Sequence, residues 1–328
     1  MSVATVAPSA SEPILSIEDL HVRFPVAGGL LRQRRTIHAV NGVDLAVQSG
    51  QCVSLVGESG CGKSTTALAI MGLQAPSSGV ITVEGRPVYG PGAPDRLARA
   101  RLAQIVFQDP FSTLNPRETI GRALSQPLML HGVKDRTERA DRVATALRQV
   151  GLLPEHAARY PHEFSGGQRQ RIGIARALIL GPRLIVLDEP VSALDVSIRA
   201  QIINLLMDLQ QNLGLSYLMI SHDLGVVEHV SDRVAVMFAG QIVEEGGWRE
   251  VFTTPTHPYT RRLIETIPNP ASLAGGAQDI LPPAPEPPAG TRFWPPIGQR
   301  PEISRPAAPS ALVGIGDDHR VRVQLVDN

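Results

Sequence analysis

A glycine-rich loop between a predicted strand and a predicted helix constrains this chain more than any other feature. Residues 57–65 read GESGCGKST and fit the pattern G-x-x-x-x-G-K-[ST]. Residues 52–56 before the loop predict a buried strand, and residues 64–71 after it predict a helix. The backbone N–H groups of such a loop, with the positive end of the following helix, hold polyphosphate without many charged side chains. The pattern therefore favours an α/β fold with a nucleotide site at the end of a strand.

We expect most residues of this segment, called the phosphate loop below, to contact nucleotide phosphates. Glycines are needed there because a Cβ would block the close approach of the backbone to the ligand. By the chemistry of such loops, Lys63 contacts the β- and γ-phosphates, and the Ser64 hydroxyl ligates Mg²⁺. The predicted contact residues are Gly57, Ser59, Gly60, Cys61, Gly62, Lys63, Ser64 and Thr65.

Two neighbouring carboxylates follow an apolar run later in the chain. Residues 184–187 (LIVL) predict a strand that is covered on both faces, as in a parallel sheet. Asp188 and Glu189 come at the carboxyl end of that strand, where open α/β sheets place their ligands. One carboxylate is suited to Mg²⁺, and the next is suited to polarise an attacking water. We assign Asp188 to the metal and Glu189 to the water.

A third motif lies just before this strand. Residues 165–168 (SGGQ) open a segment, residues 169–180, that predicts a helix. A serine hydroxyl, glycine N–H groups and a helix N-terminus are together suited to contact phosphate. Along the chain, the phosphate loop comes first, this motif second and the carboxylate pair third. Together they resemble the ATP-binding subunits of ABC transporters, whose signature the second motif matches. The resemblance covers roughly residues 14–250.

The resemblance implies roles for several other residues. In that family, the signature of one subunit closes over the γ-phosphate held by a second subunit. Gln108 matches the Q-loop, where an amide senses Mg²⁺ and the attacking water. Residues 192–195 (SALD) match the D-loop, which passes between subunits, and His222 matches the switch histidine, which contacts the γ-phosphate. The signature residues carried over in this way are Ser165, Gly167 and Gln168.

Phe24 has two interpretations. It lies at the end of a predicted strand over residues 14–24, where this family has an aromatic side chain that stacks on adenine. An apolar aromatic residue in such a strand also serves as part of a core. Both interpretations of Phe24 remain open at this point.

The resemblance also implies the domain organisation. The expected fold is α/β: an ABC-type P-loop ATPase with a RecA-like core, an antiparallel β subdomain and a helical subdomain inserted at about residues 109–165. We expect a disordered tail over residues 1–13 and the nucleotide-binding domain over residues 14–254. Dense proline then predicts a loosely folded extension over residues 255–328.

Several details resemble the branch that powers import of dipeptides, oligopeptides and nickel. Residues 160–164 (YPHEF) precede the signature, residues 28–36 resemble an insertion of that branch, and residues 256–260 (THPYT) match its His-Pro-Tyr motif. The implied function is ATP hydrolysis coupled to peptide uptake, with nickel or another small solute as the alternative cargo. Some relatives bind an iron–sulfur cluster through cysteines of the extension. The matching residues 290–297 (GTRFWPPI) contain no thiol, so we predict no cluster.

Composition limits the possible partners. The chain has 31 Lys and Arg against 31 Asp and Glu, and it shows no basic stripe of the kind that binds nucleic acid. No apolar run approaches the ~20 residues that span a bilayer, and residues 1–13 lack the features of a signal peptide. We therefore expect a peripheral protein at the cytoplasmic face of the inner membrane. The implied partners are two transmembrane permease subunits, a second ABC ATPase subunit (commonly a different chain) and an extracytoplasmic solute-binding protein.

Two other hypotheses use the same motifs. A soluble ABC ATPase that assists an enzyme complex, as in the carbon–phosphorus lyase system, looks very similar, and the His-Pro-Tyr motif argues against it. DNA-repair and translation ABC proteins typically carry paired ATPase domains, zinc-binding cysteines or basic linkers. This chain has one phosphate loop, and its two cysteines fit no metal-binding pair.

Overall fold

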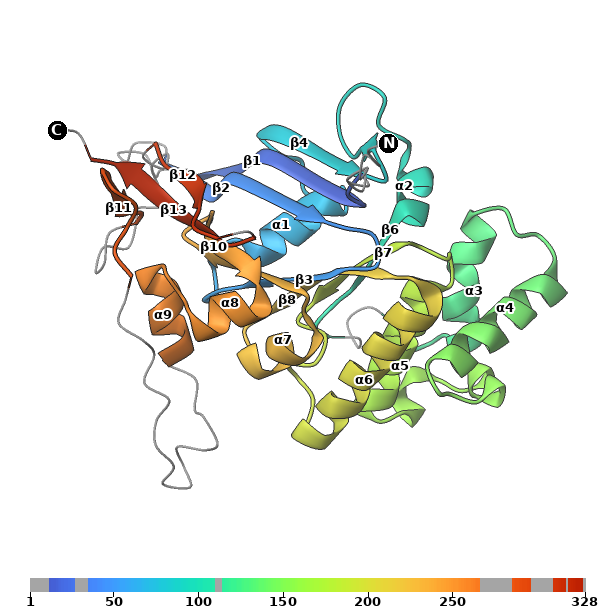
Figure 1. The fold of residues 1–328 in the computed structure, drawn as a ribbon. Coiled ribbons are helices and arrows are strands. Elements are labelled where there is room, and N and C mark those ends of the chain that lie inside the picture. Colours follow the sequence, from blue (N-terminus) through green and yellow to red (C-terminus); the bar gives the residue numbers. More distant parts are fainter. Residues whose placement is uncertain are drawn as a thin grey trace, which may run out of the picture.

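The strands of the protein form two sheets that enclose a helix. The computed structural model describes residues 12–26, 35–109, 114–265, 285–295, 309–316 and 318–326. Within these residues there is a four-stranded sheet, in the order β2-β1-β4-β5, and a nine-stranded sheet. Figure 1 shows α1 (Lys63–Ile70) between the two sheets, and its buried residues share one hydrophobic core with both. The phosphate loop begins this helix, so it is anchored in the centre of the fold.

A parallel set of strands forms one side of the larger sheet, with β6 at the edge. Its order is β9-β3-β8-β7-β6, and all neighbours in this set are parallel. Because parallel strands end at the same edge, the loops after them lie together. The strands are β3 (Cys52–Val56), β6 (Ala103–Val106), β7 (Leu184–Asp188), β8 (Ser216–Ser221) and β9 (Arg233–Phe238).

The four-stranded sheet is the expected antiparallel subdomain. Its strands are β1 (Leu15–Val26), β2 (Arg35–Val47), β4 (Ser78–Val83) and β5 (Arg86–Pro87), followed by α2 (Arg96–Leu102). Alternating residues of β1 are buried against α1, which is the pattern of a sheet with one covered face. The predicted insertion at residues 28–36 and the predicted tail at residues 1–13 lie largely outside the described residues.

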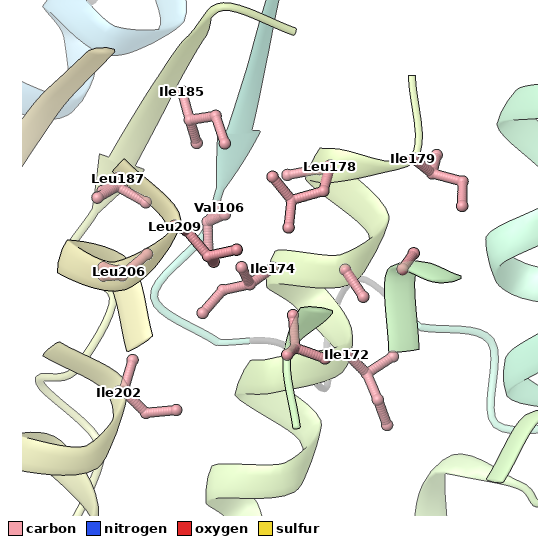
Figure 2. Close-up of a cluster of buried hydrophobic side chains, with 14 of the residues drawn as sticks. Val106, Ile172, Ile174, Leu178, Ile179, Ile185, Leu187, Ile202, Leu206 and Leu209 are labelled. Atoms are coloured by element: carbon pink, nitrogen blue, oxygen red, sulfur yellow. The ribbon is translucent and has the colours of Figure 1, made fainter. Parts of the chain in front are cut away.

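Helices form the opposite end of the molecule. They are α3 (Ile120–Leu130), α4 (Arg136–Gln149), the short turns Pro154–Ala158 and Pro161–Glu163, α5 (Gly166–Leu178) and α6 (Val196–Leu213). The next helix, α7 (Leu224–Val230), lies nearer the middle of the molecule and packs against β3 and β9. Figure 2 shows Ile174 of α5 facing Leu206 of α6 across a core that also includes Leu187 of β7, while Ile172 points to the other side of α5. The predicted helical subdomain contains α3 and α4, and α5 carries the signature motif. None of the described helices is long and apolar enough to cross a bilayer.

The chain after residue 247 adds to the larger sheet. Its described residues form α8 (Trp248–Thr253), α9 (Pro258–Glu265) and three short strands, β11 (Thr291–Phe293), β12 (Ala311–Gly314) and β13 (Arg320–Leu325). β13 pairs with β10 (Gln241–Gly247), which itself pairs with β9. Figure 1 places these strands at the far end of the molecule from α3 and α4. The prediction of a loosely folded extension is therefore wrong for these strands, because their backbone groups complete the edge of the sheet.

Candidate functional site

The backbone of the phosphate loop takes conformations that glycine adopts most easily. Gly57 has φ 148°, Gly60 has φ 78° and Gly62 has φ 116°. A Cβ on Gly57 would lie 2.1 Å from the carbonyl oxygen of Met237, and one on Gly62 would lie 2.3 Å from that of Ala39. The glycines therefore let the loop pack tightly against β9 and β2 while its tip stays open. Ser59 and Gly60 are exposed at that tip, Thr65 is half-buried and Cys61 is buried.

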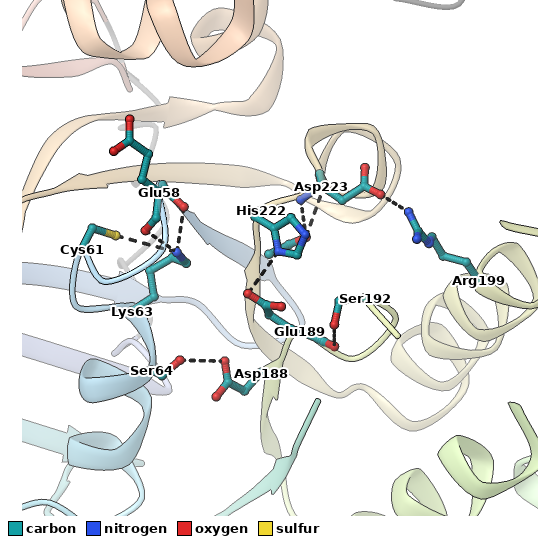
Figure 3. A network of polar contacts seen from close by, with 12 residues as sticks. Glu58, Cys61, Lys63, Ser64, Asp188, Glu189, Ser192, Arg199, His222 and Asp223 are labelled. Carbon is teal, nitrogen blue, oxygen red and sulfur yellow. Dashed lines mark hydrogen bonds and ion pairs between the residues drawn. The ribbon is translucent and has the colours of Figure 1, made fainter. Parts of the chain in front are cut away.

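The Lys63 amine lies inside the curve of the loop (Figure 3). Its Nζ donates to the carbonyl oxygens of Gly57 at 2.7 Å and Glu58 at 2.9 Å, and it lies 3.8 Å from Cys61 Sγ. Lys63 is only 6% exposed. A buried ammonium group requires polar partners, and here the loop carbonyls supply them. The amine is thus held at the place where the loop would receive phosphate oxygens.

Ser64 and Asp188 bring two potential metal ligands together. Ser64 Oγ donates to Asp188 Oδ1 over 3.2 Å, from the first turn of α1 to the end of β7. Burial raises the pKa of Asp188 above its usual value, and the hydrogen bond from Ser64 opposes that shift. A hydroxyl and a carboxylate are hard oxygen ligands of the kind that Mg²⁺ prefers. The residues present therefore fit a magnesium ion bound beside the phosphate loop.

Glu189 and His222 form the second polar pair at this edge of the sheet. His222 Nδ1 lies 3.1 Å from Glu189 Oε1, and Figure 3 shows the pair beside Ser64 and Asp188. Glu189 has φ 50°, and its N–H donates to the carbonyl oxygen of Ile220 in β8 at 2.9 Å. Because a positive φ is strained for glutamate, the position is consistent with a functional constraint. The Ser192 hydroxyl donates to the carbonyl oxygen of Glu189 at 3.1 Å.

The structure shows a link that sequence reasoning missed, between the D-loop segment and the residue after His222. Asp223 caps α7, because its Oδ1 accepts from the N–H groups of Gly225 and Val226. Its other oxygen pairs with Arg199 of α6, which also donates to the carbonyl oxygen of Leu194 at 3.4 Å. An aspartate before a short apolar helix could have predicted the cap. Nothing local in the sequence indicates the pairing with Arg199.

The signature residues lie on another part of the molecule. Ser165 accepts from the N–H of Gln168, and Gln168 Oε1 accepts from the N–H of Ser165, so the two residues cap the start of α5. A Cβ on Gly167 would lie 2.4 Å from Ile198 Cγ2, so this glycine lets α5 pack closely on α6. Ser165 is exposed. Its availability to a nucleotide held by a second subunit stays a prediction.

Gln108 and Phe24 are the remaining predicted site residues. Gln108 follows β6 and is exposed. Because β6 pairs in parallel with β7, Gln108 lies at the same edge of the sheet as Asp188. Phe24 is half-buried in β1, opposite Ile37, and packs against the core around α1. These contacts agree with the interpretation of Phe24 as part of a core. Adenine stacking by Phe24 stays a prediction.

Comparison with known proteins agrees with this geometry. Residues 40–192 match the family described as ABC transporter. The chain is 52% identical over 262 residues to the glutathione import ATP-binding protein GsiA of Pectobacterium atrosepticum, covering 80% of this chain and 42% of that protein. It is 54% identical over 260 residues to the protein of the same name from Escherichia coli K12, and the match covers 78% of this chain and 41% of that protein. The chain thus spans about two fifths of the length of these curated relatives.

Solved structures with this fold are also similar. The ATP-binding cassette MJ0796, in a dimeric post-hydrolysis state with ADP and Pi, gives a TM-score of 0.62 at 28% identity and covers 72% of this chain and 99% of that one. The protein cbiO1 of Clostridium perfringens is part of the ABC transporter complex cbiONQ. It gives a TM-score of 0.62 at 27% identity, and the match covers 80% of this chain and 99% of that one. These likenesses confirm the predicted fold class.

Proposed function

Because the chain belongs to the family of ABC transporter ATP-binding proteins, we propose that it hydrolyses ATP to drive uptake of peptides across the cytoplasmic membrane. One observation carries the proposal. The Lys63 amine, the Ser64–Asp188 pair and the Glu189–His222 pair lie at one edge of the parallel sheet, as phosphoryl chemistry requires.

Each pair has a defined task in hydrolysis. The Lys63 amine would exchange loop carbonyls for phosphate oxygens, and Ser64 and Asp188 would hold Mg²⁺. A magnesium ion held there would supply positive charge to the phosphates. Glu189 takes a proton from the attacking water, and His222, 3.1 Å from its carboxylate, orients it.

The position of the signature supports a site shared by two subunits. Ser165 is exposed on α5, whereas the phosphate loop lies at the start of α1. We infer that this chain pairs with a second ABC ATPase subunit, and that each nucleotide lies between the phosphate loop of one and the signature of the other. Two transmembrane permease subunits would hold the pair at the cytoplasmic face of the inner membrane, with an extracytoplasmic solute-binding protein delivering the cargo.

The peptide class of cargo is supported by the names of the relatives. Two proteins that are 52% and 54% identical to the matched part of this chain are named for glutathione import. The His-Pro-Tyr motif of residues 256–260 resembles the peptide and nickel branch, so nickel is the alternative cargo.

Uptake by intact cells tests this proposal. Cells lacking this chain would be supplied with wild type or with Glu189→Gln and offered labelled glutathione, a labelled dipeptide or labelled nickel. We expect wild type, and not the variant, to restore uptake of at least one peptide. Restored nickel uptake with unchanged peptide uptake would refute the peptide class, and no dependence of any uptake on the chain would refute the importer function.

A further inference from the structure

The His257-Pro258-Tyr259 turn contacts the phosphate loop, although the two segments lie far apart in the sequence. The Tyr259 hydroxyl oxygen accepts from the backbone N–H of Glu58 at 3.1 Å. The Tyr259 ring packs on Phe238 with centroids 4.1 Å apart. Phe238 ends β9, directly after the Met237 carbonyl against which Gly57 is packed. The turn, the end of β9 and the start of the loop therefore form one packed junction.

The peptide that Tyr259 contacts is the one that also holds the Lys63 amine. The Glu58 N–H belongs to the peptide unit between Gly57 and Glu58, and its carbonyl oxygen accepts from Lys63 Nζ at 2.7 Å. Because a peptide unit is planar and rigid, fixing the direction of its N–H also fixes the direction of its carbonyl. Tyr259 thus sets the orientation of a carbonyl that positions the lysine.

The His257 side chain connects this turn to the C-terminal strands. Its Nδ1 accepts from the N–H of Tyr259 at 3.1 Å, so its Nε2 carries the proton and donates to the Trp294 carbonyl oxygen at 2.9 Å. His257 is 1% exposed, and burial lowers its pKa to about 4, which agrees with a neutral ring. Trp294 directly follows β11 and is held by its own N–H, which donates to the Arg322 carbonyl oxygen of β13 at 3.2 Å.

A buried carboxylate fixes the start of the turn. Glu244 of β10 is 0% exposed and accepts from the N–H groups of Thr256 at 2.7 Å and His257 at 2.9 Å. His319 Nε2 lies 2.7 Å from the same carboxylate, from the segment before β13. Three partners for one buried carboxylate make the turn a rigid element.

We propose that Tyr259 is a positioning residue for the phosphate loop, and that the C-terminal strands hold it in place through His257. The connection runs from the Trp294 carbonyl through the His257 ring to the Tyr259 N–H, and from the Tyr259 hydroxyl through the 57–58 peptide to Lys63. The inference rests on the proposed function, because it takes the loop to bind ATP. It assigns the extension a part in nucleotide affinity.

Tyr259→Phe tests the first half of this proposal, because it removes the hydroxyl and keeps the ring against Phe238. The dissociation constant for MgATP would be measured by calorimetry on the full chain, with Glu189→Gln in every sample to prevent turnover. We expect the constant to rise about three- to tenfold, the factor that corresponds to one hydrogen bond. A change below twofold would refute the role of Tyr259.

Tyr89→Phe is the matched control. Its hydroxyl donates to the Ala69 carbonyl oxygen at 2.9 Å, so its loss removes a partly buried hydrogen bond away from the phosphate loop. We expect a lower melting temperature without nucleotide and an unchanged dissociation constant for MgATP. An equal rise of the MgATP dissociation constant in Tyr259→Phe and Tyr89→Phe would mean that loss of any partly buried hydrogen bond weakens binding. That result would refute the proposal. Absence of MgATP binding by the Glu189→Gln chain with both tyrosines in place would instead refute the proposed function.

His257→Asn tests the second half. An asparagine side-chain oxygen still accepts from the N–H two residues later, so the local turn is kept while the bond to the Trp294 carbonyl is lost. We expect the MgATP constant to rise at least twofold. An unchanged constant in His257→Asn, with a raised one in Tyr259→Phe, would confine the role to Tyr259 and refute that of the C-terminal strands.

Discussion

Replacing Glu189 with glutamine removes a proton acceptor from the site and changes almost no volume. The side chain lies at the end of β7, with Oε1 3.1 Å from His222 Nδ1, and its backbone is held to Ile220 of β8. A glutamine keeps an oxygen that accepts a hydrogen bond from the imidazole. It cannot take a proton from water, so only the chemical step is changed.

The expected magnitude follows from that role. A positioned general base typically contributes 10²- to 10⁴-fold to a rate. At about 1.36 kcal/mol per factor of ten, its loss raises the barrier by about 3–5 kcal/mol. In the proposed mechanism, nucleotide binding depends on the phosphate loop and on the Ser64–Asp188 pair, which the substitution does not touch. ATP should therefore stay bound and remain uncleaved in Glu189→Gln.

The assay measures phosphate release and retained nucleotide on the same purified preparation at saturating MgATP. Glu138→Gln is the control, because it also removes one carboxylate, from an exposed pair with Arg142 on α4. We expect the control to hydrolyse ATP at the wild-type rate. A rate for Glu189→Gln within about threefold of wild type, where a lost base costs at least a hundredfold, would remove Glu189 from its role.

The structure supports three further predictions. Gly57→Ala should cost about 1–3 kcal/mol more in the free energy of unfolding than Gly60→Ala, because only the first Cβ meets a backbone oxygen, at 2.1 Å; equal losses would contradict the packing of the loop. Burial lowers the pKa of His257 from 6.5 to about 4 in the folded protein. Between pH 4 and 6.5, the His257 side chain therefore binds a proton in the unfolded chain and remains neutral in the folded one. Stability should therefore fall by an amount on the order of 3 kcal/mol as pH decreases from 6.5 to 4, and His257→Asn should remove that part of the slope in urea titrations. Purified protein should contain no stoichiometric iron, because residues 290–297 contain no thiol, and one iron or more per chain would contradict this.

Local patterns predict the elements that hold the candidate site. The apolar run before Asp188 is buried on both faces in β7, and the glycine loop lies between β3 and α1 as expected. Ser165 caps α5 through a capping box with Gln168, a signal that is readable over four residues. Such features depend on backbone hydrogen bonding and on burial within one segment, so the sequence contains them directly.

Contacts between distant segments were not predictable in the same way. The bond from Glu58 to Tyr259 joins residues 201 positions apart, and His319 reaches Glu244 across 75 positions. Both depend on the path of the chain through the sheet, which a single sequence does not specify. Dense proline after residue 255 indicates a loosely folded segment, so the sequence does not predict the C-terminal strands. The alternation in residues 320–324 (RVRVQ) was the available signal for β13.

Co-purification distinguishes an importer subunit from an ATPase that serves an enzyme complex. The chain would be tagged in its own cell, the membranes solubilised and the bound proteins identified by mass spectrometry. We expect two multi-spanning permeases and a second ABC ATPase, with the signature of that ATPase cross-linking near Lys63 in the presence of ATP. Recovery from the soluble fraction alone, together with metabolic enzymes, would contradict this expectation and favour an ATPase that serves an enzyme complex.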